Sequence, residues 1–238
     1  MEAIRTEKLT KSYGKARGII DLDLRVEQGD FFGFIGPNGA GKSTTIRTLL
    51  GLIRPTSGRG EVLGLDITRQ NGEILNRVGY LPSEAVLYRG MKVRELLRFS
   101  AGLRKRDCVK EGEALCERLR LDPTRRVEEL SLGNRKKAGI VCALQHRPEL
   151  LILDEPTSGL DPLMQREFSN ILKECHREGT TIFLSSHVLS EIRRNCFQAL
   201  VLREGRAVAR LGREELGKSE EEFEDHFLQY YMEGDEEA

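Results

Sequence analysis

The stretch from Phe31 to Leu50 constrains the fold of this chain more than any other. Four of its first five residues are apolar, which predicts a short strand buried on both faces of a parallel sheet. The pattern G-x-x-x-x-G-K-[ST] follows from Gly36 to Ser43, and apolar residues then recur at helical spacing. The sequence therefore predicts a strand, a glycine-rich loop and a helix in that order.

The residue types of this loop indicate phosphate binding. Its glycines allow backbone conformations closed to other residues, so successive N–H groups can turn inward around an oxyanion at a helix N-terminus. Lys42 supplies a mobile positive charge, and Ser43 supplies a hydroxyl group for Mg²⁺. We expect the phosphate-binding residues to be Gly36, Pro37, Asn38, Gly39, Ala40, Gly41, Lys42, Ser43 and Thr44.

Polar side chains follow two further predicted strands. The apolar run from Leu150 to Leu153 ends at Asp154 and Glu155, and a strand from Thr180 to Leu184 leads toward His187. Strands that alternate with helices predict an α/β fold with right-handed crossovers, in which ligands bind at the carboxyl ends of the strands. We therefore expect four side chains to converge at one sheet edge: Lys42, Asp154, Glu155 and His187.

Segments with two other sequence patterns flank this predicted core. Strict alternation from Ile19 to Val26 predicts a half-buried antiparallel strand with Ile20, Leu22, Leu24 and Val26 on one face. Shorter strands near residues 4–9 and 61–67 complete a small antiparallel sheet, with Tyr13 in the loop between the first two strands. Apolar residues at helical spacing predict three helices in a helical subdomain at about residues 84–145.

We expect one domain over residues 1–238. Near its end a hairpin is predicted at residues 200–211, and the acidic tail from 219 to 238 is expected to form a docked helix with Phe223, Phe227, Leu228 and Tyr231 on one face. No apolar run is long enough for a secretory signal core or a membrane span, so we expect any spanning part to be another chain.

The charge balance gives no global attraction to nucleic acid, because charged residues form 32% of the chain and cancel to a net charge of zero. Three local basic clusters, at residues 104–106, 125–126 and 135–137, are expected to be solvated helix faces. The five cysteines include no C-x-x-C pair, which is typical of proteins in a reducing cytosol.

Four motifs in order resemble the ATP-binding cassette of ABC transporters. They are the phosphate loop and the segments Leu130–Asn134 (LSLGN), Leu150–Asp161 (LLILDEPTSGLD) and Ser185–His187 (SSH), and the resemblance covers almost the whole chain. It implies a P-loop NTPase fold with a RecA-like parallel sheet, a small antiparallel β-subdomain and a helical subdomain. It also implies ATP and Mg²⁺ as ligands, and it is strongest to stand-alone bacterial or archaeal cassettes that energise a separate permease, often an exporter.

The resemblance implies a role for each matching residue. Ser43 and Asp154 would hold Mg²⁺, Glu155 would polarise the attacking water, and His187 would contact the γ-phosphate. Tyr13 would stack on the adenine ring. The remaining positions would serve the contact with a second cassette: Asp161 in the loop facing the partner, and Ser131, Gly133 and Asn134 in the signature motif.

These implied roles require partners. Two cassettes, which we expect to be identical, would close head to tail on two ATP molecules and drive a polytopic membrane permease from the cytoplasmic face of the cell membrane, where the chain would be peripheral. The sequence departs from the family pattern at Leu132, at Asn134 and after Pro82, where Ser83 stands in place of the usual glutamine and Glu84 follows. Either Ser83 or Glu84 could place an oxygen on the metal.

Two alternatives remain at this point. One is a soluble cassette ATPase that acts on cytosolic machinery, in iron–sulfur cluster assembly or on the ribosome. The other is a regulatory cassette that binds ATP without turnover, which the presence of Lys42, Glu155 and His187 disfavours.

Overall fold

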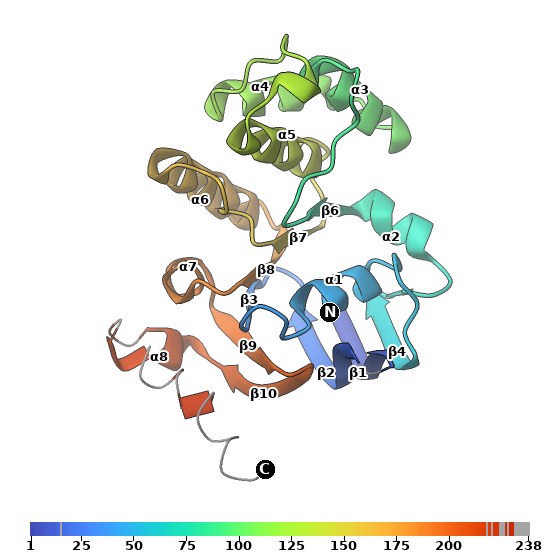
Figure 1. Cartoon of the computed structure of the whole chain (residues 1–238), viewed down its shortest axis with the longest axis vertical. Coiled ribbons are helices and arrows are strands. Elements are labelled where there is room, and N and C mark those ends of the chain that lie inside the picture. The colour runs from blue at the N-terminus through green and yellow to red at the C-terminus, as the bar shows by residue number, and fades with distance from the viewer. Residues whose placement is uncertain (15, 218, 220, 224–226, 228, 231–238) are drawn as a thin grey trace. The chain divides into compact units, whose positions relative to one another are not determined.

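We describe the protein from a computed structural model, in which residues 1–14, 16–217, 219, 221–223, 227 and 229–230 are described. The chain divides into two compact units (Figure 1). The first unit contains residues 1–74 and 181–238, and the second contains residues 75–180. The chain passes from the first unit to the second within helix α2 (Asn71–Arg77) and returns to the first unit between Thr180 and Thr181.

The first unit is built on β-strands. An antiparallel sheet has the strand order β2-β1-β4-β5, and four further strands of this unit lie in the order β10-β9-β3-β8. The strands are β1 (Glu2–Tyr13), β2 (Ala16–Glu27), β3 (Phe31–Ile35), β4 (Ser57–Val62), β5 (Leu65–Asp66), β8 (Thr181–Ser186), β9 (Gln198–Arg203) and β10 (Arg206–Leu211). Its helices are α1 (Lys42–Leu49), α7 (Leu189–Asn195) and α8 (Arg213–Leu216).

Strand β3 is paired in parallel with both β8 and β9. All residues of β3 and β8 are buried, as expected for strands covered on both faces. The register places Ile35 opposite Ser186 on one side and opposite Val201 on the other. Because β3 and β8 end side by side, the segments that follow them leave from the same edge of the sheet.

The predicted face of β2 is wrong at one residue. Ile20 is exposed, whereas Ile19 is fully buried. The cause is an irregularity at Asp21, which has a φ of +47° and lies where the pairing with β1 shifts register. An extra residue in one strand reverses the side-chain alternation on either side of it, so the predicted pattern holds only from Leu22 onward.

The other strands of the antiparallel sheet differ in extent from the prediction. The strand expected near residues 4–9 extends over Glu2–Tyr13, and the strand expected at residues 61–67 is a hairpin formed by β4 and β5. Its turn contains Leu63 and Gly64, which have φ values of +52° and +74°. Two successive residues with positive φ reverse the chain, and apolar spacing alone does not encode that reversal.

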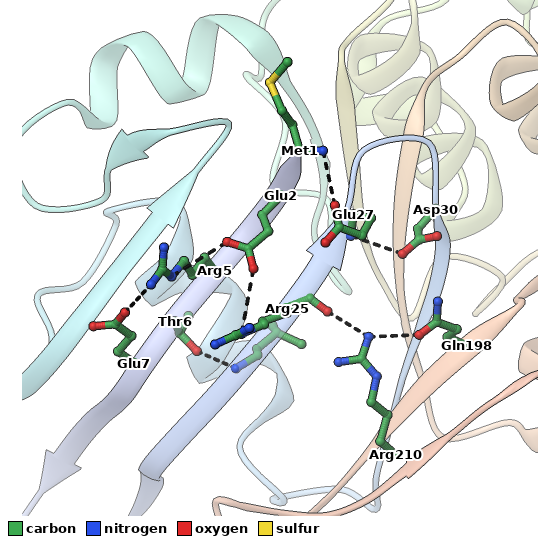
Figure 2. Close-up of polar contacts among 11 residues, drawn as sticks. Met1, Glu2, Arg5, Thr6, Glu7, Arg25, Glu27, Asp30, Gln198 and Arg210 are labelled. Carbon is green, nitrogen blue, oxygen red and sulfur yellow. Dashed lines mark hydrogen bonds and ion pairs between the residues drawn. The ribbon is translucent and has the colours of Figure 1, made fainter.

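Arg210 connects the two sheets of the first unit (Figure 2). Its Nη2 atom on β10 donates to the carbonyl oxygen of Arg25 on β2 at 3.2 Å and to Oε1 of Gln198 on β9 at 2.9 Å.

On β1, the Thr6 hydroxyl donates to the carbonyl of Leu22 at 2.7 Å and accepts from the N–H of Leu24 at 2.9 Å. A side chain thus supplies hydrogen bonds where the ladder is irregular.

The second unit combines two parallel strands with helices. Its elements are β6 (Val78–Leu81), α3 (Val93–Leu103), α4 (Val109–Arg118), the 3₁₀ helix η1 (Val127–Glu129), α5 (Leu132–Leu144), β7 (Leu150–Asp154) and α6 (Pro162–Arg177). The β6–β7 register places Leu81 opposite Leu153. Helix α5 approaches β6 closely, since a Cβ atom at Gly79 would lie 2.2 Å from the carbonyl oxygen of Ala143.

The predicted helices of residues 84–145 correspond to α3, α4 and α5. Helical spacing also includes Leu103 at the end of α3, but Leu103 is 63% exposed and does not share the buried face of that helix. The basic cluster at 135–137 is also not a solvated face throughout, because Lys136 is only 3% exposed. Parallel strands, an antiparallel sheet and helices together confirm the predicted α/β class.

The acidic tail is described only in part. Phe223 and Phe227 are buried, with ring centroids 6.4 Å apart. Leu228 and Tyr231, which were expected on the same face, lie outside the described residues. A docked helix over residues 219–238 therefore stays a prediction. Among the described residues, none of the helices has the length and apolar character needed to cross a bilayer.

Candidate functional site: a phosphate loop and an acidic strand end

The predicted strand, loop and helix are present in the first unit. Strand β3 ends at Ile35, and α1 begins at Lys42. The tip of the loop from Pro37 to Gly39 is exposed, whereas Gly36 and Ala40 at its base are buried. Gly41 is the N-cap of α1 with a φ of +107°, and this conformation strongly favours glycine. The loop thus presents backbone to solvent at the N-terminus of a helix, where anions bind.

Two loop glycines are also required by close packing. A Cβ atom at Gly36 would lie 2.4 Å from the carbonyl oxygen of Leu202, and one at Gly41 would lie 2.7 Å from the carbonyl oxygen of Gly18. The backbone of β9 and the start of β2 therefore press against the loop from two sides. The glycine pattern encodes this close approach as well as the conformation of the loop.

Gly205, in the turn between β9 and β10, braces the loop. Its N–H donates to the carbonyl of Ala40 at 2.9 Å, and its own carbonyl accepts from the N–H of Ile20 at 2.8 Å. Three segments distant in sequence are thereby joined by main-chain bonds. These main-chain bonds hold the loop in a defined shape, which reduces the ordering cost of ligand binding.

Lys42 is held against its own loop. Its Nζ atom donates to the carbonyl oxygen of Gly36 at 2.6 Å and to that of Pro37 at 3.2 Å, and the side chain is 6% exposed. Ser43 and Thr44 follow in the first turn of α1 and are half-buried. The three residues lie at one helix end with their polar groups beside the exposed N–H groups of the loop. This arrangement suits a phosphate chain, so the site fits a nucleotide.

Two other predicted residues lie in the first unit. His187 follows β8 directly and is exposed. Since Ser186 pairs with Ile35, His187 and the start of the phosphate loop leave the sheet at the same edge. Tyr13 ends β1 opposite Ala16, is 48% exposed, and has Lys11 Nζ 5.2 Å from its ring centroid. Its hairpin continues into Gly18, which contacts the phosphate loop.

The acidic residues lie in the second unit. Asp154 ends the fully buried strand β7 and is 1% exposed, and Glu155 follows it with a φ of +48°. Strand β6 ends beside β7, so Ser83 and Glu84 follow at the same edge. Ser83 is half-buried, Glu84 is exposed, and both line an open cavity of about 400 Å³.

The donor chemistry of these residues fits magnesium. The described residues contain no group of three or more His, Cys, Asp and Glu side chains that could hold a metal ion by themselves. Mg²⁺ on a nucleotide requires fewer protein ligands, because phosphates and water supply the rest and one or two carboxylates suffice. Hydroxyl and carboxylate oxygens such as those of Ser43 and Asp154 are the donors it prefers.

The signature segment forms the start of α5. Ser131 is its N-cap, with Oγ accepting from the N–H of Asn134 at 3.3 Å. A Cβ atom at Gly133 would lie 2.9 Å from the carbonyl oxygen of Gly159, so glycine is favoured here by packing against the segment that leads to Asp161. Leu132, where the sequence departs from the family pattern, is 66% exposed and disturbs no buried packing.

Sequence reasoning missed two residues at these sites. Gly205 was expected only as part of the hairpin at residues 200–211, and nothing in its surroundings in the sequence points to the phosphate loop. Lys136 was grouped with exposed basic residues, although its Nζ donates to three main-chain carbonyls. The signal for Lys136 was available: it lies at helical spacing with Ile140 and Ala143, both buried.

Comparisons with known proteins agree with this geometry. A sequence profile described as ABC transporter matches residues 19–158. The bacitracin transport ATP-binding protein BcrA of Bacillus licheniformis is 40% identical over 219 residues, which cover 90% of this chain and 71% of that protein. A solved structure described as the ATP-binding subunit of an ABC transporter has 28% identity and a TM-score of 0.87, with 96% of this chain and 99% of that one covered.

A more distant structure shares the fold. It is described as a dimeric post-hydrolysis state of the ATP-binding cassette MJ0796 bound to ADP and Pi, and it has 19% identity and a TM-score of 0.82 over 88% of this chain and 98% of that one. The expected P-loop NTPase fold is thereby confirmed.

Proposed function

Because this chain belongs to the ABC transporter family and is an ATP-binding cassette and ATPase of that family, we propose that it drives a separate polytopic membrane permease as one half of a head-to-tail cassette dimer. The observation that carries the proposal is the preformed loop from Gly36 to Gly41, which ends at Lys42 at the N-terminus of α1. Such a loop binds the phosphates of a nucleotide through its backbone N–H groups.

Lys42 is proposed to bind the outer phosphates of ATP. Its present acceptors are carbonyl oxygens of its own loop, and the anionic oxygens of a phosphate are stronger acceptors for an ammonium group. Residues 36–44 would cradle the phosphate chain, and Tyr13 would stack on the adenine. The exposed ring of Tyr13 on the hairpin beside the loop supports that role.

Ser43 and Asp154 are proposed to hold Mg²⁺, with Ser83 or Glu84 as a further ligand. The ion, when bound, would neutralise charge on the phosphates. The position of Asp154 at the carboxyl end of the buried strand β7 supports this assignment, since ligands of α/β folds bind at the carboxyl ends of the strands. Glu84 would add negative charge and strengthen metal binding in place of the family glutamine.

Glu155 is proposed to be the general base that takes a proton from the attacking water. His187 would contact the γ-phosphate and orient that water. The pairing of β3 with β8 supports a common site for His187 and the phosphate loop, because both leave the same edge of the sheet. The direct succession of Asp154 and Glu155 after a buried strand supports the division into a metal ligand and a base.

A second copy of the chain is proposed to complete each ATP site. Ser131, Gly133 and Asn134 would contact the γ-phosphate bound by the partner cassette through the N-terminus of α5, and Asp161 would lie in the loop that faces the partner. The dimer described for the distantly related MJ0796 cassette supports this assembly. The departure at Leu132 leaves the serine hydroxyl and the helix end available.

We propose export as the direction of transport and the cytoplasmic face of the cell membrane as the location. The support is the 40% identity to a relative that is named as a bacitracin transport ATP-binding protein. The same relative favours transport over the soluble alternatives in iron–sulfur assembly or on the ribosome. Purification from detergent-solubilised membranes tests this step, with a polytopic membrane protein as the expected companion.

The decisive experiment on the ATPase is Glu155→Gln. We expect hydrolysis to fall at least about a hundredfold while ATP binding persists, because the variant keeps the binding groups and loses the base. With Mg-ATP the variant should also elute as a stable dimer. Glu113→Gln, at an exposed position on α4, is the control and should hydrolyse at the normal rate. A normal rate in Glu155→Gln would refute the assigned base.

A further inference from the structure

Lys136 is a buried lysine with an unusual set of acceptors. It lies on α5, its side chain is 3% exposed, and its Nζ atom donates to three carbonyl oxygens. The distances are 3.2 Å to Pro82, 2.9 Å to Ser83 and 2.9 Å to Glu155. An ammonium group has three N–H donors, so these three carbonyls match its hydrogen-bonding capacity and compensate its burial.

The three carbonyls belong to two separate loops. Pro82 and Ser83 follow β6, and Glu155 follows β7, whose last residues pair with those of β6. The side chain of Lys136 therefore joins the two loops through their main chains. In these three bonds Lys136 contacts main-chain atoms only.

The Glu155 backbone needs such support. Its φ of +48° is in the left-handed region, which costs a non-glycine residue conformational energy. A residue in that region keeps its conformation only if its surroundings fix it. The hydrogen bond from Lys136 to the Glu155 carbonyl fixes the peptide group that follows Glu155, and hence the direction of its side chain.

Helix α5 provides a rigid base for this contact. A Cβ atom at Gly139, one turn after Lys136, would lie 3.0 Å from the side chain of Leu81 and 3.1 Å from that of Ala85. The approach of Ala143 to Gly79 fixes the helix further along. Because α5 packs tightly on β6 at these positions, Lys136 cannot follow the loops if they move.

We propose that Lys136 is a positioning residue that holds the loop carrying Ser83 and Glu84 and the loop carrying Glu155 in one fixed arrangement. It acts through Glu155 and does not itself touch the nucleotide. The inference rests on the proposed function, since it assigns Glu155 as the base. Loss of the three donors would release both loops, and hydrolysis would slow while the phosphate loop of the first unit kept its affinity for ATP.

The test uses two substitutions of nearly equal size. Lys136→Met removes every donor, whereas Lys136→Gln keeps an N–H₂ group that can reach at least part of the carbonyl set. Lys137→Met removes a charge from the adjacent, half-buried lysine and is the control. Amide hydrogen exchange at residues 83–85, 155, 157 and 158 is measured together with the thermal midpoint, ATP affinity and kcat.

In Lys136→Met we expect the amide hydrogens of these two loops to exchange at least about tenfold faster than in wild type. Amide exchange in the first unit should be unchanged. Its kcat should fall at least about tenfold with ATP affinity within about twofold of wild type. Lys136→Gln should lie between Lys136→Met and wild type in both measurements. The Lys137→Met control should match wild type.

Two results would overturn the proposal. The first is that Lys136→Met has the same amide exchange in the two loops and the same kcat as the Lys137→Met control. The second is that its amide exchange is faster throughout the chain and its kcat is lowered only in proportion to the unfolded fraction. If Lys136→Met does not fold, Lys136→Gln decides by the same measurements. Hydrogen exchange needs no turnover, so it tests the contact even if the wild-type chain proves inactive, which would refute the proposed function separately.

Discussion

The side-chain carboxylate of Asp161 accepts a hydrogen bond from the backbone N–H of Met164, 3.0 Å away, and so caps α6. Pro162 follows at the first position of the helix, where its fixed φ and missing N–H cost nothing. The family resemblance assigns Asp161 to the contact with a partner cassette. The residue thus has a local structural role in addition to its proposed role in the dimer.

These two roles of Asp161 can be separated. Asp161→Ala should lower the free energy of unfolding by about 1 kcal/mol, because it leaves a helix N–H without its cap. Asp161→Asn should stay within about 0.5 kcal/mol of wild type, since asparagine caps equally well. Urea denaturation of the monomer measures both. Equal stability of the alanine variant and wild type would show that the cap contributes nothing.

Lys42→Ala should weaken ATP binding at least about tenfold, since it removes the positively charged side chain of the phosphate loop. Titration with ATP in the absence of Mg²⁺ measures the effect without interference from hydrolysis. Arg47→Ala, which removes an exposed cation from the same helix, serves as the control and should bind ATP normally. Unchanged affinity of Lys42→Ala would contradict the assignment of the loop.

Gly39 and Gly41 offer a matched pair of substitutions. Both have positive φ, of +82° and +107°, but a Cβ atom at Gly39 meets nothing within 4 Å, whereas one at Gly41 would lie 2.7 Å from the carbonyl oxygen of Gly18. We expect Gly39→Ala to cost about 1 kcal/mol of stability through backbone strain alone. Gly41→Ala should cost at least about 2 kcal/mol, because strain and overlap add. Thermal unfolding ranks the two, and the reverse order would contradict the packing described here.

His146 should make stability depend on pH. It is 3% exposed, and burial, aided by the positive charge of Arg104, lowers its pKa from 6.5 to about 4. The unfolded chain binds a proton below pH 6.5 that the folded chain excludes until about pH 4, so stability is complete above pH 6.5 and is lost as the pH falls toward 4.

For this shift the expected loss by pH 5.5 is about 1.4 kcal/mol. Denaturation at pH 8 and at pH 5.5 measures it, and His146→Gln should lose less stability between the two values than wild type. His176→Gln, at a half-buried position on α6, is the control and should behave as wild type does. An equal loss in His146→Gln and wild type would show that His146 does not cause the dependence.

Much of the fold follows from patterns that are local in sequence. Mostly apolar runs predicted β3 and β7 because parallel strands are buried on both faces, and helical spacing predicted α3 and α5. The conformation at Asp21 was not predictable in this way. It moves Ile20 to the surface because positive φ at a single residue depends on pairing with a distant strand.

The site was predictable to the same extent. The glycine pattern indicated the phosphate loop, because the residues that allow the conformation of the loop lie close together in the sequence. The hydrogen bonds from Gly205 to Ala40 and from Lys136 to Glu155 join residues far apart in the chain. Neither a glycine nor a lysine indicates by its residue type which residue it will bond to. Tertiary contacts of this kind depend on how strands and helices meet, which a single sequence does not state.

The Gly205 brace bears on how this protein can be shortened or rearranged. A fragment that ends at His187 would contain every recognisable motif and would still lack the main-chain bond that supports Ala40. Such a fragment would contain the sequence motifs of the nucleotide site but would lack a contact that supports the phosphate loop. For the same reason a circular permutant should not place its new termini between Glu204 and Gly205, although that turn looks dispensable in the linear sequence.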